Sequence, residues 1–333
     1  MLRPGLTLAW RSDDALQLGV DDPNPVVLNG LPAQCRAALA LMDGTSTGDA
    51  ILARLAATGP TDGICELIDR LMAMGALVDG GRWPGGANVA VAARDQLLPD
   101  LMARAPRDPD RWWESLARTH VTVVGASRLG AIIACALSSG GVGRVTVDDS
   151  RPVTAADVAL GGFQRSDVGQ RRSELLASRA DLQTMKSSAE AKRQIWVITD
   201  AVDIDAKARS LTAQHSPFLI ASCRERVGWV GPLVVPGVTA CHFCVQLHRR
   251  DHDPAWPQVW RQRTWDATPV ALASAAAVTA HIAASHVVEW TCGAAVPSMR
   301  GVVEVDSEFG MAGFHPTPPH PECGCVWASL AAS

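Results

Sequence analysis

Four cysteines in two close pairs are the residues of this chain whose spacing most clearly suggests a chemistry. Cys241 and Cys244 are separated by two residues, and Cys323 and Cys325, far downstream, by one. Two such thiol pairs suit a tetrahedral Cys₄ zinc site, whose closed thiolate shell leaves no position for water and is therefore structural. A C-x-x-C pair can instead be a redox pair, but the second pair favours zinc. The histidines that could replace a cysteine ligand are His242, His315 and His320.

A turn with the sequence GASRLG, at residues 125–130, is the second candidate site. It joins an apolar run to an Ala-rich helical stretch, which is how a nucleotide-binding βαβ unit begins. In the full fingerprint, three glycines make the turn, admit a pyrophosphate and pack the helix on the strand. Gly125 and Gly130 keep the first and last positions, whereas Ser127 takes the middle one. A turn of this kind can also be purely structural.

The elements that must position these residues alternate between strand and helix. Apolar runs that predict strands lie at 121–124, 144–147, 194–199, 217–222 and 227–235. Helical stretches and loops separate them, and this alternation predicts a doubly wound α/β sheet. The second strand ends at Asp148, where such folds hold a ribose hydroxyl. The uncharged run 267–288 is long enough to span a membrane, but its hydrophobicity is weak, so we expect a buried helix and no membrane partner.

Residues 1–83 follow a different pattern, with three short strands, three compact helices and a closing strand at 76–79. This order predicts a small winged-helix-like domain. A Gly/Pro-rich linker and a helical lead-in over 84–118 then separate it from the sheet domain, 119–333.

Winged-helix domains usually recognise DNA. Residues 1–83 carry 6 Arg against 10 Asp plus Glu, however, so they would repel a phosphate backbone, and we expect no nucleic-acid partner. A strand edge beside an apolar helix groove can instead capture an extended peptide by strand addition. A packing or dimerisation role is the alternative. The candidate peptide-binding residues are Val26, Val27, Leu28, Ile64 and Leu67.

The composition agrees with a folded chain of two domains. Of its 333 residues, 47% are hydrophobic and 19% charged, which is enough to bury large cores. The net charge of −4 lacks the basic excess of a nucleic-acid binder. The first ten residues lack the apolar stretch of a secretion signal, so we expect a cytoplasmic protein whose cysteines bind metal or stay as thiols.

The glycine turn, the Asp-tipped second strand and the paired cysteines after a later strand together resemble the ThiF/MoeB/HesA (E1-like) activating enzymes, over roughly residues 119–333. Members of that superfamily bind ATP with Mg²⁺ and adenylate the C-terminal carboxylate of a small protein or peptide. The resemblance therefore implies a Rossmann-like sheet with a structural zinc site, and it implies a homodimer.

One branch is especially similar, because it combines an acidic winged-helix-like N-terminus with the ending HPECGC, residues 320–325. This branch comprises the E1-like leader-peptide-binding proteins of thiazole/oxazole-modified microcin clusters, which make ribosomally synthesised and modified peptides (RiPPs). What the branch implies is binding of a precursor's leader peptide and its presentation to a YcaO-type cyclodehydratase.

Most positions that serve ATP in active members are altered here. The family's G-x-G-G-L-G turn is GASRLG, at residues 125–130. The Asn and Arg of its S-N-L-x-R-Q segment fall on Asp157 and Leu160, and the lysine of its V-G-x-x-K motif is Arg172. The Mg²⁺-binding aspartate of its D-x-x-D-N motif matches Asp203, and no thioester cysteine is evident. The positions that would hold the cofactor are Gly125, Ser127, Arg128, Gly130, Asp148 and Asp203.

These substitutions leave three functions open. The expected one is a catalytically degenerate E1-like protein that binds a leader peptide and presents it to a partner enzyme. An active adenylyltransferase would use Arg172 and Asp203, with Arg128 and Asp148, in altered geometry. A non-catalytic assembly protein is the third. The first is favoured because an adenylating site needs its cationic clamps and metal ligands together.

Overall fold

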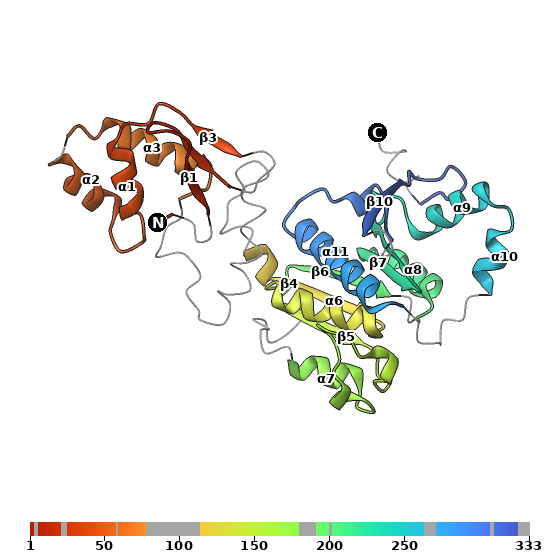
Figure 1. Ribbon diagram of the computed structural model, residues 1–333. Coiled ribbons are helices and arrows are strands. Elements are labelled where there is room, and N and C mark those ends of the chain that lie inside the picture. Colours follow the sequence, from red (N-terminus) through yellow and green to blue (C-terminus); the bar gives the residue numbers. More distant parts are fainter. Residues whose placement is uncertain are drawn as a thin grey trace. The chain divides into compact units, whose positions relative to one another are not determined.

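The computed structural model describes residues 1–2, 6–20, 25–57, 59–77, 114–179, 191–199, 202–262, 271–306 and 310–325 (Figure 1). The chain divides into two compact units, Met1–Glu114 and Ser115–Ser333. Each unit has its own sheet and its own helices. The finer boundaries 1–83, 84–118 and 119–333 stay a prediction, because residues 78–113 lie outside the described ones.

The N-terminal unit combines a three-stranded antiparallel sheet with three helices. These elements are β1 (Leu8–Trp10), β2 (Leu16–Leu18), β3 (Val26–Leu28), α1 (Gln34–Leu41), α2 (Gly48–Ala56) and α3 (Asp62–Ala73). The strand order is β1-β2-β3, so that β1 and β3 are the two edges of this sheet. After α3, Leu77 forms an isolated antiparallel bridge with Leu2. This bridge stands at the predicted closing strand, of which residues 78–79 lie outside the described ones.

A single apolar core joins this sheet to its helices. Leu16 on β2 and Leu67 and Leu71 on α3 are all fully buried within it. The α3 residues recur at helical spacing because only one stripe of an amphipathic helix faces the sheet. Thr47 begins α2 by accepting a hydrogen bond from the Ala50 N–H, as an N-cap threonine does.

The second unit is built on a seven-stranded mixed sheet. Its strands are β4 (Thr119–Val124), β5 (Arg144–Asp148), β6 (Arg193–Thr199), β7 (Phe218–Arg224), β8 (Val227–Val234), β9 (Gly301–Asp306) and β10 (Met311–Pro316). They follow the order β10-β9-β8-β7-β6-β4-β5. The strands from β5 to β7 are parallel, and those from β7 to β10 are antiparallel. The predicted α/β sheet is confirmed, whereas β9 and β10 were not predicted.

Helices and short 3₁₀ turns connect these strands. They are α6 (Arg128–Ser139), α7 (Arg172–Arg179), α8 (Ile204–Ala213), α9 (His242–His252), α10 (Trp256–Arg261) and α11 (Ala273–Thr291), with η1 (Ala155–Asp157), η2 (Arg165–Asp167) and η4 (Pro297–Met299). Helices α6 and α11 pack against each other and against the sheet (Figure 1). None of the helices in the described parts of the chain is long and apolar enough to cross a membrane.

The position of the glycine turn follows from the strand order. The chain runs from β4 to its neighbour β5, and then crosses to β6 on the other side of β4. The carboxyl ends of β4 and β6 therefore form a topological switch point, which is where open α/β sheets bind ligands. Residues 125–130 leave β4 at this point.

Candidate functional site

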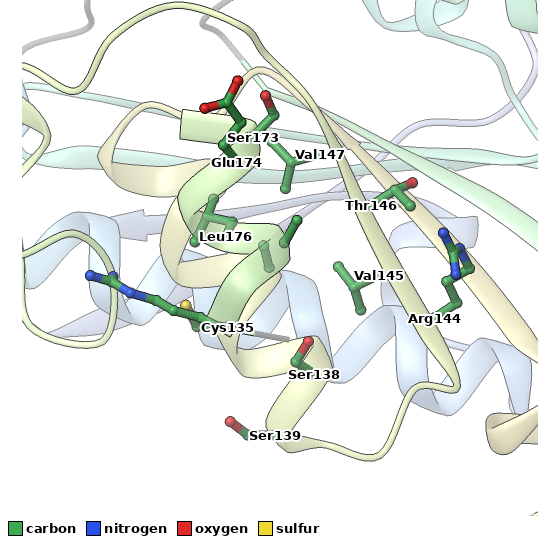
Figure 2. Close-up of a pocket in the computed structure, with 13 residues that line it drawn as sticks. Cys135, Ser138, Ser139, Arg144, Val145, Thr146, Val147, Ser173, Glu174 and Leu176 are labelled. Atoms are coloured by element: carbon green, nitrogen blue, oxygen red, sulfur yellow. The ribbon is translucent and has the colours of Figure 1, made fainter. Parts of the chain in front are cut away.

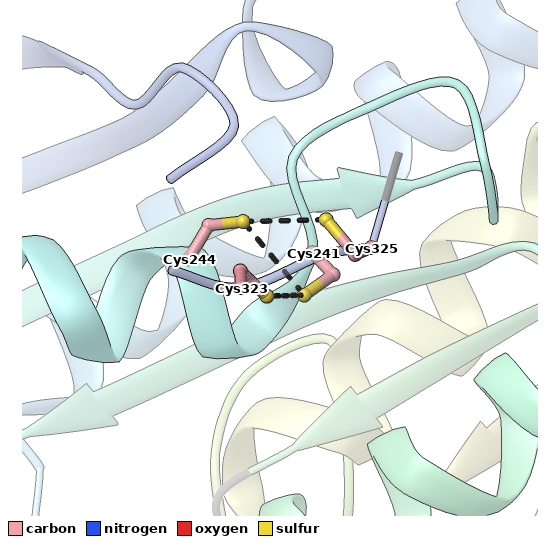
Figure 3. A group of neighbouring side chains, drawn as sticks. All are labelled: Cys241, Cys244, Cys323 and Cys325. Atoms are coloured by element: carbon pink, nitrogen blue, oxygen red, sulfur yellow. Dashed lines mark hydrogen bonds between the residues drawn. The ribbon is translucent and has the colours of Figure 1, made fainter. Parts of the chain in front are cut away.

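The four paired cysteines meet in space. Cys241 and Cys244 lie at the beginning of α9, and Cys323 and Cys325 lie on the segment that follows β10 (Figure 3). Their Sγ atoms are all within 4.8 Å of one another, with Cys241–Cys323 and Cys244–Cys325 both at 3.4 Å. A tetrahedral zinc with Zn–S bonds of about 2.3 Å places its sulfurs about 3.8 Å apart. The donor set and its spacing therefore fit zinc.

The three histidines that could have replaced a cysteine are directed elsewhere. Each histidine Nε2 lies near a carboxylate oxygen: His242 is 2.7 Å from Asp205, His320 is 2.8 Å from Asp251 and His315 is 2.6 Å from Glu304. Among the described residues, the four thiols are the only group of three or more such ligand atoms that lie close enough together to hold a metal ion.

Backbone and thiol contacts prepare Cys244 as a thiolate. The hydrogen bond with the Cys241 thiol lowers the pKa of Cys244, and the His320 N–H, which donates to its Sγ over 3.3 Å, lowers it further against the opposing effect of burial. A hydrogen bond from the backbone to a metal-bound sulfur is a common supporting contact.

The glycine turn has the close packing of a nucleotide-binding fold. Gly125 has a φ of 84°, which favours glycine. A Cβ on Gly130 would lie 2.0 Å from the Gly125 carbonyl oxygen, so only glycine lets α6 pack this closely on the turn. Across the switch point, the Thr199 hydroxyl donates to that carbonyl oxygen over 2.9 Å. Ser127 is buried at the N-cap of α6 and makes no capping hydrogen bond through its side chain.

A buried carboxylate that sequence analysis missed, Asp149, faces this turn. It accepts a hydrogen bond from the Ala126 N–H over 2.8 Å, and its side chain is also bound by Arg151 and Arg172. Burial by itself would raise the pKa of Asp149, but these hydrogen bonds outweigh it and hold the pKa well below its ordinary value. The ionised carboxylate of Asp149 therefore already accepts the hydrogen bond of the Ala126 N–H, which is one of the backbone donors of the turn. The predicted ribose contact, Asp148, is exposed and lies 3.4 Å from the Lys207 Nζ.

Arg172, the cation predicted at the lysine position, is closed inside the protein. Its guanidinium donates to Asp149 over 2.9 Å and to Asp157 over 2.6 Å, and the side chains of all three are 2% exposed or less. Asp157 also accepts hydrogen bonds from the Thr154 N–H and hydroxyl. Leu160 is instead almost fully exposed. Arg172 and Asp157, which stand at two of the positions that would contact phosphates, therefore form an ion pair with each other.

The remaining cofactor positions also have structural partners. Asp203 is the N-cap of α8 and accepts from the Ala206 N–H over 3.1 Å. Arg128 donates to the Ala271 carbonyl oxygen over 2.5 Å, which ties the beginning of α6 to the segment before α11. The chain thus brings Gly125, Gly130 and Asp148 to the carboxyl ends of β4 and β5, while Arg128 and Asp203 serve helix ends.

The predicted peptide-binding residues divide by burial. Val26 and Val27 on β3 are half-buried. Leu28, Ile64 and Leu67 belong to the core and are at most 3% exposed. A direct contact of those three with a peptide would require that core to open, because the apolar stripe of α3 is its inward face.

Two cavities lie away from the glycine turn. One, of about 480 Å³, is lined by α6, β5 and α7, with Cys135, Ser138 and Glu174 on its walls (Figure 2). The other, of about 740 Å³, lies between β7, β8 and α9 and is rich in Trp and His. Sequence analysis did not identify either cavity, since each depends on how its elements pack in space.

This combination of a mixed sheet, a glycine turn at its switch point and a paired-cysteine cluster defines an E1-like nucleotide-binding fold. The ThiF family model matches residues 108–325, and the chain belongs to this family. A search of the curated proteins finds no match.

Solved structures show the same fold. E. coli MccB with ATP is 17% identical and aligns over 98% of this chain and 99% of its own, with a TM-score of 0.69. E. coli MccB with MccA-N7isoAsn is 16% identical and aligns over 98% of this chain and 99% of its own, also with a TM-score of 0.69. The heterocyclase TruD is 18% identical and matches 98% of this chain over 42% of its own length, with a TM-score of 0.61.

Proposed function

We propose that this ThiF-family protein binds the leader segment of a precursor peptide and presents it to a modifying enzyme, without adenylating the peptide. MccB is a microcin C7 biosynthetic enzyme with solved complexes containing ATP or N-formylated MccA, and TruD is a heterocyclase. These neighbours support a role in peptide modification. They leave open whether this chain performs the ATP step itself.

The ion pairs of Arg172 carry the proposal. A phosphate-binding site needs a cation that can reach the ligand, but Arg172 is enclosed between Asp149 and Asp157. Removing one partner from a buried ion pair costs about 3–5 kcal/mol, so releasing Arg172 toward a phosphate would be unfavourable. Asp149 also places its charge on the Ala126 N–H, beside the position of a triphosphate. Both features disfavour the electrostatic stabilisation on which phosphoryl chemistry depends.

An active adenylyltransferase is the alternative, and one observation favours it. Gly125, Gly130 and Asp148 keep their places at the carboxyl ends of the parallel strands, and Lys207 adds a cation beside Asp148. ATP–pyrophosphate exchange in the presence of a precursor peptide separates the two functions. We expect exchange at the background rate, and exchange far above that rate would establish the active enzyme.

The N-terminal unit supplies the proposed peptide site. Strand β3 pairs only with β2 among the described strands, so its outer edge is available to a peptide strand. Met72 of α3 is 62% exposed and adds apolar surface to this winged-helix-like unit. The ThiF-like unit would then dock the partner, for which a YcaO-type cyclodehydratase is our candidate, and the protein would act as a homodimer.

Binding to the full chain is measured with fluorescently labelled candidate leader peptides, taken from short open reading frames that neighbour this gene. Proline interrupts strand pairing, so Val27→Pro on β3 should weaken the leader affinity at least tenfold. The matched control is Leu8→Pro on β1, the opposite edge, where the register also turns the backbone N–H away from β2, and it should leave the affinity unchanged. Equal leader affinity of a folded Val27→Pro variant and the wild type would show that the peptide does not add to β3.

A further inference from the structure

The larger cavity, of about 740 Å³, contains a half-buried cation held between two indole rings. The guanidinium carbon of Arg249, on α9, lies 4.8 Å from the ring centroid of Trp229 on β8 and 4.8 Å from that of Trp256 on α10. None of the residues that line this cavity belongs to the glycine turn or to the cysteine pairs. It is therefore distinct from both sites described above.

The rings that hold Arg249 are themselves fixed by polar contacts. The Trp256 Nε1–H donates to Gln246 over 2.8 Å, and the Trp229 ring packs against His315 at 5.6 Å between centroids. Trp260 lies 5.7 Å from Trp256 and donates to Asp205. Stacking on an aromatic face stabilises a guanidinium but leaves its in-plane N–H donors available. The arginine is thus held in one orientation before any ligand arrives.

The charge of Arg249 has no bonded counterion. Within the described chain, its guanidinium makes no hydrogen bond and no ion pair, and the nearby Glu304 is engaged with His315 over 2.6 Å. Partial burial lowers the pKa of Arg249, and the charge of the nearby Glu304 offsets this effect only in part. A charge that is partly withdrawn from water in this way is usually paired.

We propose that this cavity binds a peptide carboxylate, with the guanidinium of Arg249 pairing with both of its oxygens and the Trp229 and Trp256 rings enclosing the adjoining residue. Planar, bidentate pairing with carboxylates is what arginine does better than lysine. The inference rests on the proposed function, in that a precursor peptide is the ligand, and it adds a second contact on the ThiF-like unit.

The charges around the cavity favour a carboxylate over a phosphate. Arg224 and Arg249 line it together with Glu225 and Asp253, so that the two signs balance. A triphosphate would bring several negative charges against these carboxylates, whereas a single carboxylate matches the one cation without a bonded partner. The indole surfaces also suit an amino-acid side chain, because aromatic and arginine side chains are common anchors at peptide interfaces.

The test uses the full-length protein and defined probes, measured by isothermal titration calorimetry. The probe pair for a terminal carboxylate is N-acetyl-Ala-Ala-Phe as the free acid and as the amide. The pair for a side-chain carboxylate is N-acetyl-Ala-Glu-Phe-amide and its Gln counterpart. At least one acid should bind ten or more times more tightly than its neutral partner. Equal binding of acid and neutral forms in both pairs would overturn the proposal, and this comparison needs no variant.

Variants then locate the contact. Arg249→Gln should remove the preference for the acid, and Arg249→Lys should weaken it, because lysine keeps the charge but loses the planar pairing. The matched control is Arg250→Gln, which changes the next residue, whose partners are Asp251 and Glu322. The proposal would be wrong if Arg249→Gln still bound the acids more tightly than their neutral partners. It would also be wrong if ATP, and not the acids, bound through Arg249.

These outcomes are separable from those of the proposed function. If pyrophosphate exchange revealed an active enzyme, the dependence of acid binding on Arg249 would still stand. If the cavity did not bind acids, leader affinity and its loss in Val27→Pro would be unaffected.

Discussion

The Arg172 Nη2 atom lies 2.6 Å from the Asp157 Oδ2 atom, and both side chains are buried. The pair joins α7 to η1, and Asp149 extends it to the glycine turn. A cation and two carboxylates that satisfy each other in this way act as part of the core. Their first role in this protein is therefore to hold the loop after β5 against the sheet.

This arrangement predicts that Arg172 contributes to stability. Arg172→Met should lower the free energy of unfolding by about 3–5 kcal/mol, because two buried carboxylates lose their counterion. Urea denaturation followed by circular dichroism measures the change. The control is Arg171→Met, at an exposed neighbour with a long 3.7 Å contact to Glu174, which should change stability by less than about 1 kcal/mol. If the free energy of unfolding of Arg172→Met equalled that of the wild type, the ion pairs would not stabilise the fold, and Arg172 would instead be available to bind a ligand.

The cysteine cluster predicts one bound zinc per chain. Cys241→Ser or Cys325→Ser should abolish it and lower stability by several kcal/mol, since structural zinc sites contribute about 10–16 kcal/mol of binding free energy to folding. Elemental analysis of freshly purified protein gives the metal content. Cys65→Ser, at an exposed cysteine outside the cluster, should retain the zinc. Wild-type protein that contains no metal would refute the assignment.

The packing at the turn predicts a steric effect that is independent of nucleotide binding. Gly130→Ala would place a methyl group 2.0 Å from the Gly125 carbonyl oxygen, so the helix must shift. We expect a loss of about 1–3 kcal/mol, the usual cost of overpacking, in thermal or urea unfolding. Gly48→Ala, where nothing lies within 4 Å of the added methyl group, is the control and should be close to neutral. Two variants of equal stability would mean that the turn is looser than described.

His286 of α11 predicts a pH dependence of stability. Burial lowers the pKa of this histidine from 6.5 to about 4, and its Nδ1 lies 2.9 Å from the Ser298 hydroxyl oxygen. The unfolded chain therefore binds the extra proton first. This contribution is complete above about pH 6.5 and is lost as the pH falls toward 4, by up to about 3 kcal/mol. Denaturation of wild type and His286→Gln across this range tests it, since the variant should lose less stability on acidification. Parallel pH profiles for the two proteins would contradict the prediction.

Local patterns in the sequence predicted the features that depend on neighbouring residues. The strand, turn and helix around Gly125 are encoded within about twenty residues, and the buried helix α11 follows from a single uncharged run. The cysteine pairs could be recognised because each pair is local and the residue type allows few roles. Ile64 and Leu67 were recognised as an apolar stripe, but a stripe alone does not distinguish a core from a binding groove.

The features that sequence analysis missed depend on contacts between distant segments. Asp149 and Arg172 are separated by 23 positions, and nothing local marks either as buried. Trp229 and Trp256 reach Arg249 from a strand and a helix, so their shared cation is visible only in the folded chain. Strands β9 and β10 were missed too, although they complete the antiparallel half of the sheet.

The cysteine contacts also determine how the chain would respond to cleavage. Cys244 and Cys325 are 81 positions apart, and the stretch between them contains α10, α11, β9 and β10. With a metal at the cluster, this stretch becomes a closed ring that is fastened at its two ends. A protease cut in the exposed segment between α9 and α10, residues 253–255, would then leave two fragments that migrate together in a native gel, and a strong chelator would let them separate more easily.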